Sequence, residues 1–159
     1  MNLSTVVALF GTLATAEGLR PVDELSGVVN APSDAVSSST RSAALRELVR
    51  HGTPAASAVV VKALGNPDAA DAAAGVLKDL PADHVRAALP GCAVSPSPRV
   101  ASACTAACGR NGEAACAQPL LRALPTLADA MAVERTLRAL LEIANARRDA
   151  DLARKVLAH

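Results

Sequence analysis

The chain has 159 residues and a formal net charge of +1; it is 51% hydrophobic but only 1% aromatic, with Phe10 as its one aromatic residue. Alanine, the best helix former, supplies roughly a quarter of the chain, whereas the β-branched and aromatic residues typical of strands are sparse. A basic surplus and stacking aromatics, the usual features of nucleic-acid binding, are both missing. We therefore predict an all-α protein with one domain, residues 1–159, that binds no nucleic acid.

Residues 6–16 (VVALFGTLATA) have two interpretations. They have the length of a signal-peptide core and end in Ala14-Thr15-Ala16, which fits a small-x-small cleavage site. However, no Lys or Arg precedes them, and their apolar residues recur at the spacing of an ordinary helix over residues 3–17. The second interpretation, which we favour, predicts a cytoplasmic protein; the first predicts an exported one. No stretch has the roughly 20 apolar residues of a membrane span.

Prolines and capping residues divide the remaining chain into helices. Pro21 opens a helix that runs to about Val29. Three later positions place a capping residue directly before a proline, which marks a helix start: Thr53-Pro54, Asn66-Pro67 and Ser97-Pro98. Pro81 before Asp83 predicts a fourth start, and Pro90-Gly91 the end of that helix. Two further helices are predicted over residues 131–145 and 150–157.

The helices repeat as hairpins. A shift of 60 residues superposes RSAALRELVRHGTPAASAVVVKAL, residues 41–64, on residues 101–124, and it pairs Gly52 with Gly112 and Lys62 with Arg122. A middle copy fits between them, so the period is about 30 residues. Stacked hairpins of this period form a solenoid. We expect about five antiparallel hairpins, with boundaries near 1–32, 33–65, 66–95, 96–125 and 126–159.

STRSAALRELVRHGTPAASAVVVKALGNPD and SPRVASACTAACGRNGEAACAQPLLRAL resemble HEAT repeats of the short, phycobilisome-lyase-like kind. The resemblance implies a HEAT-like superhelix that serves as a non-catalytic scaffold or adaptor for another protein or peptide. It also implies an alternative, an accessory subunit of a modifying enzyme with a thiol-linked pigment or other ligand. The Arg that follows the first helix start in this family is present as Arg41, whereas Ala101 stands there in the later copy, and Pro81 replaces an inter-helix Gly.

The four cysteines, Cys92, Cys104, Cys108 and Cys116, leave three possibilities open. Under the 60-residue shift the last three occupy the positions of Ala44, Leu48 and Ala56, which favours buried core thiols. In an exported protein they would form one or two disulfides, such as Cys108 to Cys116 across the hairpin turn. A zinc site is disfavoured, because the spacing lacks paired C-x2-C motifs.

The basic residues indicate a binding face. Lys62, Arg86 and Arg122 lie on second helices of their hairpins, and these helices line the concave side of a solenoid; we expect a cationic track there for an acidic partner. Glu47, Lys78 and Arg138 lie on first helices and are expected to face the convex side, whereas His84 is expected to be an exposed helix-start residue. The sequence has no nucleophile elbow, phosphate loop or zinc-protease motif, so we predict no enzyme activity and no cofactor or metal. Partner identity and oligomeric state are not predicted.

Overall fold

The structure, a computed structural model, describes residues 18–158 and is all-helical over this range. The predicted helix over residues 3–17 and the cleavage site after Ala16 lie outside the described residues. Ten α-helices follow one another in the described range, with short 3-10 turns between some of them. Their bounds are α1 Val22–Asn30, α2 Ser38–His51, α3 Pro54–Ala63, α4 Ala70–Val76, α5 Ala82–Val85, α6 Leu89–Cys92, α7 Pro98–Arg110, α8 Ala117–Ala123, α9 Ala130–Arg147 and α10 Ala150–Leu157.

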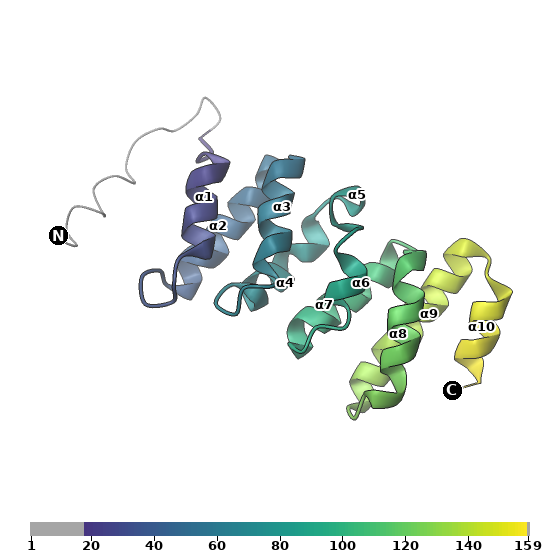
Figure 1. Cartoon of the computed structure of the whole chain (residues 1–159). Helices are drawn as coiled ribbons and strands as arrows, with labels where there is room; N and C mark the ends of the chain where they lie inside the picture. The colour runs from purple at the N-terminus through teal and green to yellow at the C-terminus, as the bar shows by residue number, and fades with distance from the viewer. Residues whose placement is uncertain (1–17, 159) are drawn as a thin grey trace.

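The helices lie in two layers (Figure 1). One layer, here the α3 layer, contains α1, α3, α5, α6 and α8; the other, the α7 layer, contains α2, α4, α7 and α9. Within the α7 layer each helix packs on the next, α2 on α4, α4 on α7 and α7 on α9, and α10 packs on α9. The layers are joined mainly through hairpin pairs such as α2 with α3. A strip of buried Ala, Leu and Val side chains fills the space between them, among them Leu25, Leu45, Leu48, Val60, Leu89, Leu120 and Leu140.

Side-chain caps explain where several helices begin. Thr53 and Ser97 accept hydrogen bonds from the amides of Ala56 and Val100, and a proline occupies the first turn of α3 and of α7. Its missing N–H costs nothing there, because the first amides of a helix have no partner inside it. Asp129 and Asp149 cap α9 and α10 in the same way. The sequence therefore located these four helices correctly, as well as α1.

The third hairpin departs from the predicted pattern. After Asn66-Pro67 the chain makes a turn, and α4 begins only at Ala70. The following helix is split into the short α5 and α6, so Pro90-Gly91 lies inside α6 rather than ending a helix. Pro90 fits because it occupies the first turn of α6, where its missing amide would have no intrahelical partner.

One glycine sets the distance between α7 and α9. A Cβ on Gly109 would lie 3.0 Å from the Cα of Ala139 and would also collide with the carboxylate of Glu142. A Cβ contact of 3.0 Å is tighter than nearly all those in real proteins, so any larger residue here would require Glu142 to turn away and α9 to move by a few tenths of an ångström. Gly109 thereby brings the two longest neighbouring helices of the α7 layer into contact along one seam.

Candidate functional site

The predicted cationic residues all lie on the α3 layer. Lys62, in the last turn of α3, and Arg122, on α8, are exposed, and neither has an ion-pair partner within residues 18–158. Arg86 follows α5, and its Nε lies 2.9 Å from Oε2 of Glu113. Glu113 also accepts a hydrogen bond from the amide of Ala115 through Oε1. Arg86 is therefore bound to an acid, which leaves Lys62 and Arg122 as the unpaired members of the predicted set.

Glu47 is not on the solvent side, contrary to the sequence-based expectation. Its residue is 8% exposed, and its carboxylate accepts three hydrogen bonds from Arg20, one from the main-chain amide at 2.6 Å and two from the guanidinium at 3.1 and 3.0 Å. Burial alone would raise the pKa of Glu47, but the hydrogen bonds and positive charge of Arg20 outweigh it and hold the pKa below the ordinary 4.5. One helical turn later, Nε2 of His51 donates to the main-chain oxygen of Arg20 at 2.8 Å. Glu47 and His51 together bind Arg20 and so attach α2 to the segment just before α1.

Arg41 is the most deeply buried charged side chain of the described residues, with 2% exposure. Its guanidinium donates to three main-chain oxygens: Nε to Val29 at 3.2 Å, Nη2 to Ala31 at 2.7 Å and Nη1 to Asp68 at 2.8 Å. These carbonyls belong to the end of α1 and the turn before α4. Arg41 therefore joins α2 to the end of α1 and to the turn before α4.

Ser57, His84 and Asp83 have the residue types of a catalytic triad. Ser57 Oγ lies 2.9 Å from Nδ1 of His84, and Nε2 of His84 lies 3.8 Å from Oδ2 of Asp83. A nucleophile must reach a substrate, but Ser57 is only 1% exposed. The cluster therefore joins α3 to α5, and His84 is half-buried by this contact rather than exposed as expected.

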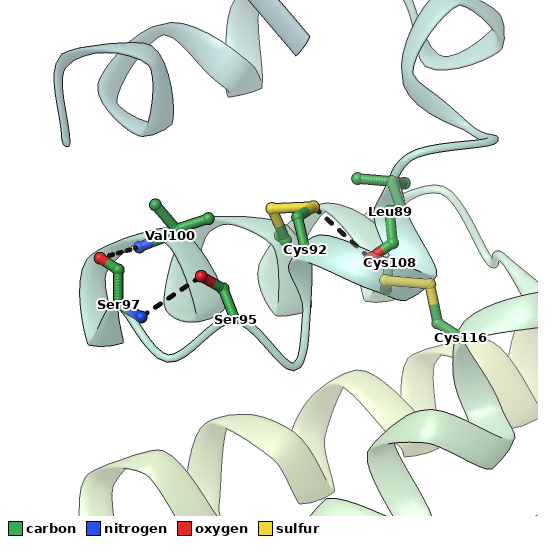
Figure 2. Close-up of a disulfide and its surroundings, with 8 residues drawn as sticks. Leu89, Cys92, Ser95, Ser97, Val100, Cys108 and Cys116 are labelled. Carbon is green, nitrogen blue, oxygen red and sulfur yellow. Dashed lines mark hydrogen bonds between the residues drawn. A yellow bond between two sulfur atoms is a disulfide. The ribbon is translucent and has the colours of Figure 1, made fainter. Parts of the chain in front are cut away.

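All four cysteines are paired. Cys108, on α7, is bonded to Cys116 across the hairpin turn, the pairing that the sequence offered as one alternative. Cys92, at the end of α6, is bonded to Cys104, one turn before Cys108 on the same face of α7, and this pairing was not predicted (Figure 2). The side chains of Cys104, Cys108 and Cys116 are fully buried, as their alignment with core residues indicated. The structure thus shows disulfides instead of the core thiols that the sequence favoured, and no group of three or more metal ligands within residues 18–158.

The seam between α7 and α9 contains two cavities. The first, of about 370 Å³, lies near the start of both helices, and its walls are mostly small side chains, including Ala93, Ala101, Ala123 and Ala132. The second, of about 290 Å³, lies further along and is lined by Arg110, Arg138 and Glu142. Arg135 lines both cavities. The two cavities therefore adjoin at Arg135, the first mostly apolar and the second basic. We call the pair the α7–α9 groove, which the sequence did not predict.

Two threonines with little exposed surface line the apolar end. Thr105 on α7 is 4% exposed and Thr136 on α9 is 5% exposed. Neither side chain forms a hydrogen bond with another group of the described chain. The hydroxyl oxygens themselves are accessible, because Glu24 Oε1 is the one fully buried side-chain oxygen or nitrogen without a partner among the described residues. They can therefore exchange hydrogen bonds with water or with a molecule in the groove.

Comparison of the chain with protein-family models, with curated proteins and with solved structures finds no match. None of the helices between residues 18 and 158 is sufficiently long and apolar to cross a bilayer.

Proposed function

We propose that the protein is a non-catalytic interaction scaffold, built as a HEAT-like α-solenoid, that binds another protein or peptide. The observation that carries this proposal is that residues joined by a side-chain hydrogen bond or ion pair are repeatedly separated by the same number of residues in the sequence. Arg20 bonds Glu47, Arg41 bonds the carbonyl of Asp68, and Ser57 bonds His84, each across 27 residues. The pair Arg86–Glu113 has the same separation.

This recurrence supports a stacked array. In a solenoid each hairpin contacts only its neighbours, so long-range bonds occur at a separation close to one repeat. A separation of 27 residues is near the period of about 30 that the sequence predicts. The order of contacts inside the α7 layer, α2 to α4 to α7 to α9, supports the same architecture.

The α3 layer is our proposed partner face, with Lys62 and Arg122 as the contacts for an acidic segment. Both side chains are exposed and unpaired within the described chain, whereas Arg86 would first have to leave Glu113. Arg86 therefore positions the turn that contains Glu113 and contributes less charge to the partner than the other two residues.

The test is affinity capture from a lysate of the source organism, with the full chain immobilised and bound proteins identified by mass spectrometry. We expect a stoichiometric protein partner that the Lys62→Glu/Arg122→Glu double variant no longer retains. The matched control is Lys78→Glu/Arg99→Glu, which makes the same charge change at exposed residues of the α7 layer. Equal retention by both double variants contradicts the assigned face, and no retained protein contradicts the scaffold function.

The disulfides favour the exported alternative over a cytoplasmic location. Disulfides persist in oxidising compartments and are rare where glutathione keeps thiols reduced. We infer that the scaffold works in an oxidising compartment. An accessory role with a thiol-linked ligand receives no support, because Cys92, Cys104, Cys108 and Cys116 are all bonded to one another. Fractionation of the source organism with a non-reducing gel tests this location: reduced protein in the cytosolic fraction contradicts it.

A further inference from the structure

We propose that the α7–α9 groove is a second binding site, which takes a short extended segment of a partner protein in which aliphatic residues stand next to acidic ones. The proposal rests on the scaffold function and adds a site formed mainly by α7 and α9, with Leu120 and Ala123 of α8 at its apolar end. It commits the groove to one kind of occupant, a peptide with an apolar end and an anionic end.

The length of the groove fits a few residues. Its lining on α7 runs from Ala101, in the first cavity, to Arg110, in the second. With the helical rise per residue this distance is roughly 14 Å, the length of about four residues of extended peptide. Arg135 lines both cavities, so they adjoin at this residue.

The apolar end selects aliphatic side chains. Its volume of about 370 Å³ lies at the small end of the range of ligand pockets. Five alanines, two prolines, Leu120 and Leu127 form its apolar wall, beside five serines and threonines and the charged Asp129 and Arg135. The unpartnered hydroxyls of Thr105 and Thr136 are available to the main-chain amide and carbonyl of a bound segment, which has both donors and acceptors.

The basic end selects carboxylates. Arg110 and Arg135 form no ion pair within residues 18–158, whereas Arg138 already pairs with Glu134 at 2.6 Å. Glu142 also lines this end, and its carboxylate lies over Gly109. Two unpaired guanidiniums next to one carboxylate leave a net positive site, and planar guanidiniums bind carboxylates in bidentate fashion. A nucleic acid fits less well, because the groove has no aromatic residue for stacking and half of its length is apolar.

The test uses a defined probe and the full chain in its oxidised form. Fluorescein-labelled hexapeptides LLDEDE and EDEDLL, which present the same residues in both chain directions, are titrated by fluorescence anisotropy. We expect one of them to bind saturably, and binding to weaken as salt rises from low to physiological concentration. Arg135→Glu and Arg110→Glu should each raise Kd about tenfold or more, since each brings a like charge next to the peptide carboxylates. Arg99→Glu reverses an exposed charge on α7, the helix of Arg110, but outside the groove, and it should change Kd less than about twofold.

A second variant tests the apolar end. Ala132→Leu fills the first cavity and should raise Kd about tenfold, whereas Ala58→Leu, at an exposed position of α3, should have no effect. The proposal is overturned if neither hexapeptide binds, if the groove variants bind as well as the wild type, or if a labelled oligonucleotide binds more tightly than both peptides. A lysate partner that is lost with Lys62→Glu/Arg122→Glu, together with no binding of either hexapeptide, would leave the scaffold function intact and reject the groove. Specific hexapeptide binding without any lysate partner would support the groove and count against the scaffold function.

Discussion

The Nη1 atom of Arg41 donates a 2.8 Å hydrogen bond to the main-chain oxygen of Asp68 and so joins the first turn of α2 to the turn before α4. The same guanidinium binds two carbonyls at the end of α1. Arg41 is 2% exposed and has only neutral acceptors, so the burial of its charge is costly. The cost is offset because the planar guanidinium binds three carbonyls at once.

Replacement of Arg41 should therefore be strongly destabilising. We expect Arg41→Ala to lower the free energy of unfolding by about 3 kcal/mol, because it leaves three carbonyls without their donors and opens a cavity. Arg41→Lys should recover only part of this loss, since an ammonium group lacks the fork geometry. Urea unfolding at neutral pH measures both, with Arg46→Ala, an exposed arginine of the same helix, as the control. An Arg41→Ala variant as stable as Arg46→Ala would contradict this role.

Glu47→Gln should lower stability by about 1–2 kcal/mol at neutral pH, since it removes the charge that accepts three hydrogen bonds from Arg20. The folded-state pKa lies below the ordinary 4.5, so the stabilisation is complete above that value and is lost as the pH falls through the lower folded-state value. The difference between wild type and variant should therefore shrink only below pH 4.5. Urea unfolding in steps of pH measures it.

Glu134→Gln provides the comparison for Glu47→Gln. Glu134 pairs with Arg138 on the exposed surface of α9, and its removal should change stability by less than about 0.5 kcal/mol at any pH. If both variants lose the same amount, the Arg20–Glu47 contact contributes no more than an ordinary surface pair.

Two glycine substitutions should have opposite signs. Gly109→Ala should cost about 1–3 kcal/mol, because its Cβ would collide with the backbone of Ala139 and push α7 and α9 apart. Gly75→Ala, inside α4 with open space around the new Cβ, should stabilise by about 0.5–1 kcal/mol through helix propensity. Thermal unfolding followed by circular dichroism distinguishes them. Stabilisation by both substitutions would show that α9 can move away from α7 at little cost, and it would contradict the role assigned to Gly109.

Both disulfides should be detectable in protein recovered without reductant. Trypsin cleaves after Arg86, Arg99, Arg110 and Arg122, so residues 100–110 carry Cys104 and Cys108 together and link residues 87–99 to residues 111–122. The intact three-peptide mass does not distinguish the two possible cross-pairings, but fragmentation between Cys104 and Cys108 does. We expect Cys104 to remain with Cys92, and Cys108 with Cys116. Labelling of these cysteines by iodoacetamide in the native, unreduced protein would refute the pairing.

Loss of either disulfide should lower the free energy of unfolding by about 2–4 kcal/mol, the usual value for loops of this length. The paired replacements Cys92→Ala/Cys104→Ala and Cys108→Ala/Cys116→Ala measure this without leaving an odd thiol. We expect the first to affect the short helices α5 and α6 most, because α6 is held to α7 by Cys92. Hydrogen exchange of residues 82–92 that is equal in the two variants would contradict that assignment.

The sequence predicted the helices that local signals define. α3 and α7 each combine a capping side chain with a proline in the first turn, and α9 and α10 start at capping aspartates, so their boundaries follow from residues close to the helix end. α6 was missed because Pro90-Gly91 was interpreted as the end of the preceding helix. A proline is equally compatible with the first turn of a new helix, and Pro90 occupies that position in α6.

The parts of the site that depend on distant residues were not predictable in this way. Glu47 was assigned to the convex side because it lies on the first helix of its hairpin, and only its contact with Arg20, 27 residues earlier, explains its burial. Cys92 has no counterpart under the 60-residue shift, so its bond to Cys104 depends on the way α6 folds back on α7. The α7–α9 groove results from the meeting of two helices at Gly109, for which the sequence offers only a glycine in an Ala-rich helix.

The two disulfides also determine how this chain would respond to mechanical tension. An array of stacked helices pulled at its ends can unfold one helix pair after another, but the segments closed by Cys92–Cys104 and Cys108–Cys116, with sequence separations of 12 and 8, cannot be drawn out. The oxidised chain should therefore reach a contour length roughly 60 Å shorter than the reduced chain. Single-molecule stretching with and without reductant would register that difference, with extension confined to the parts of the chain on either side of residues 92–116.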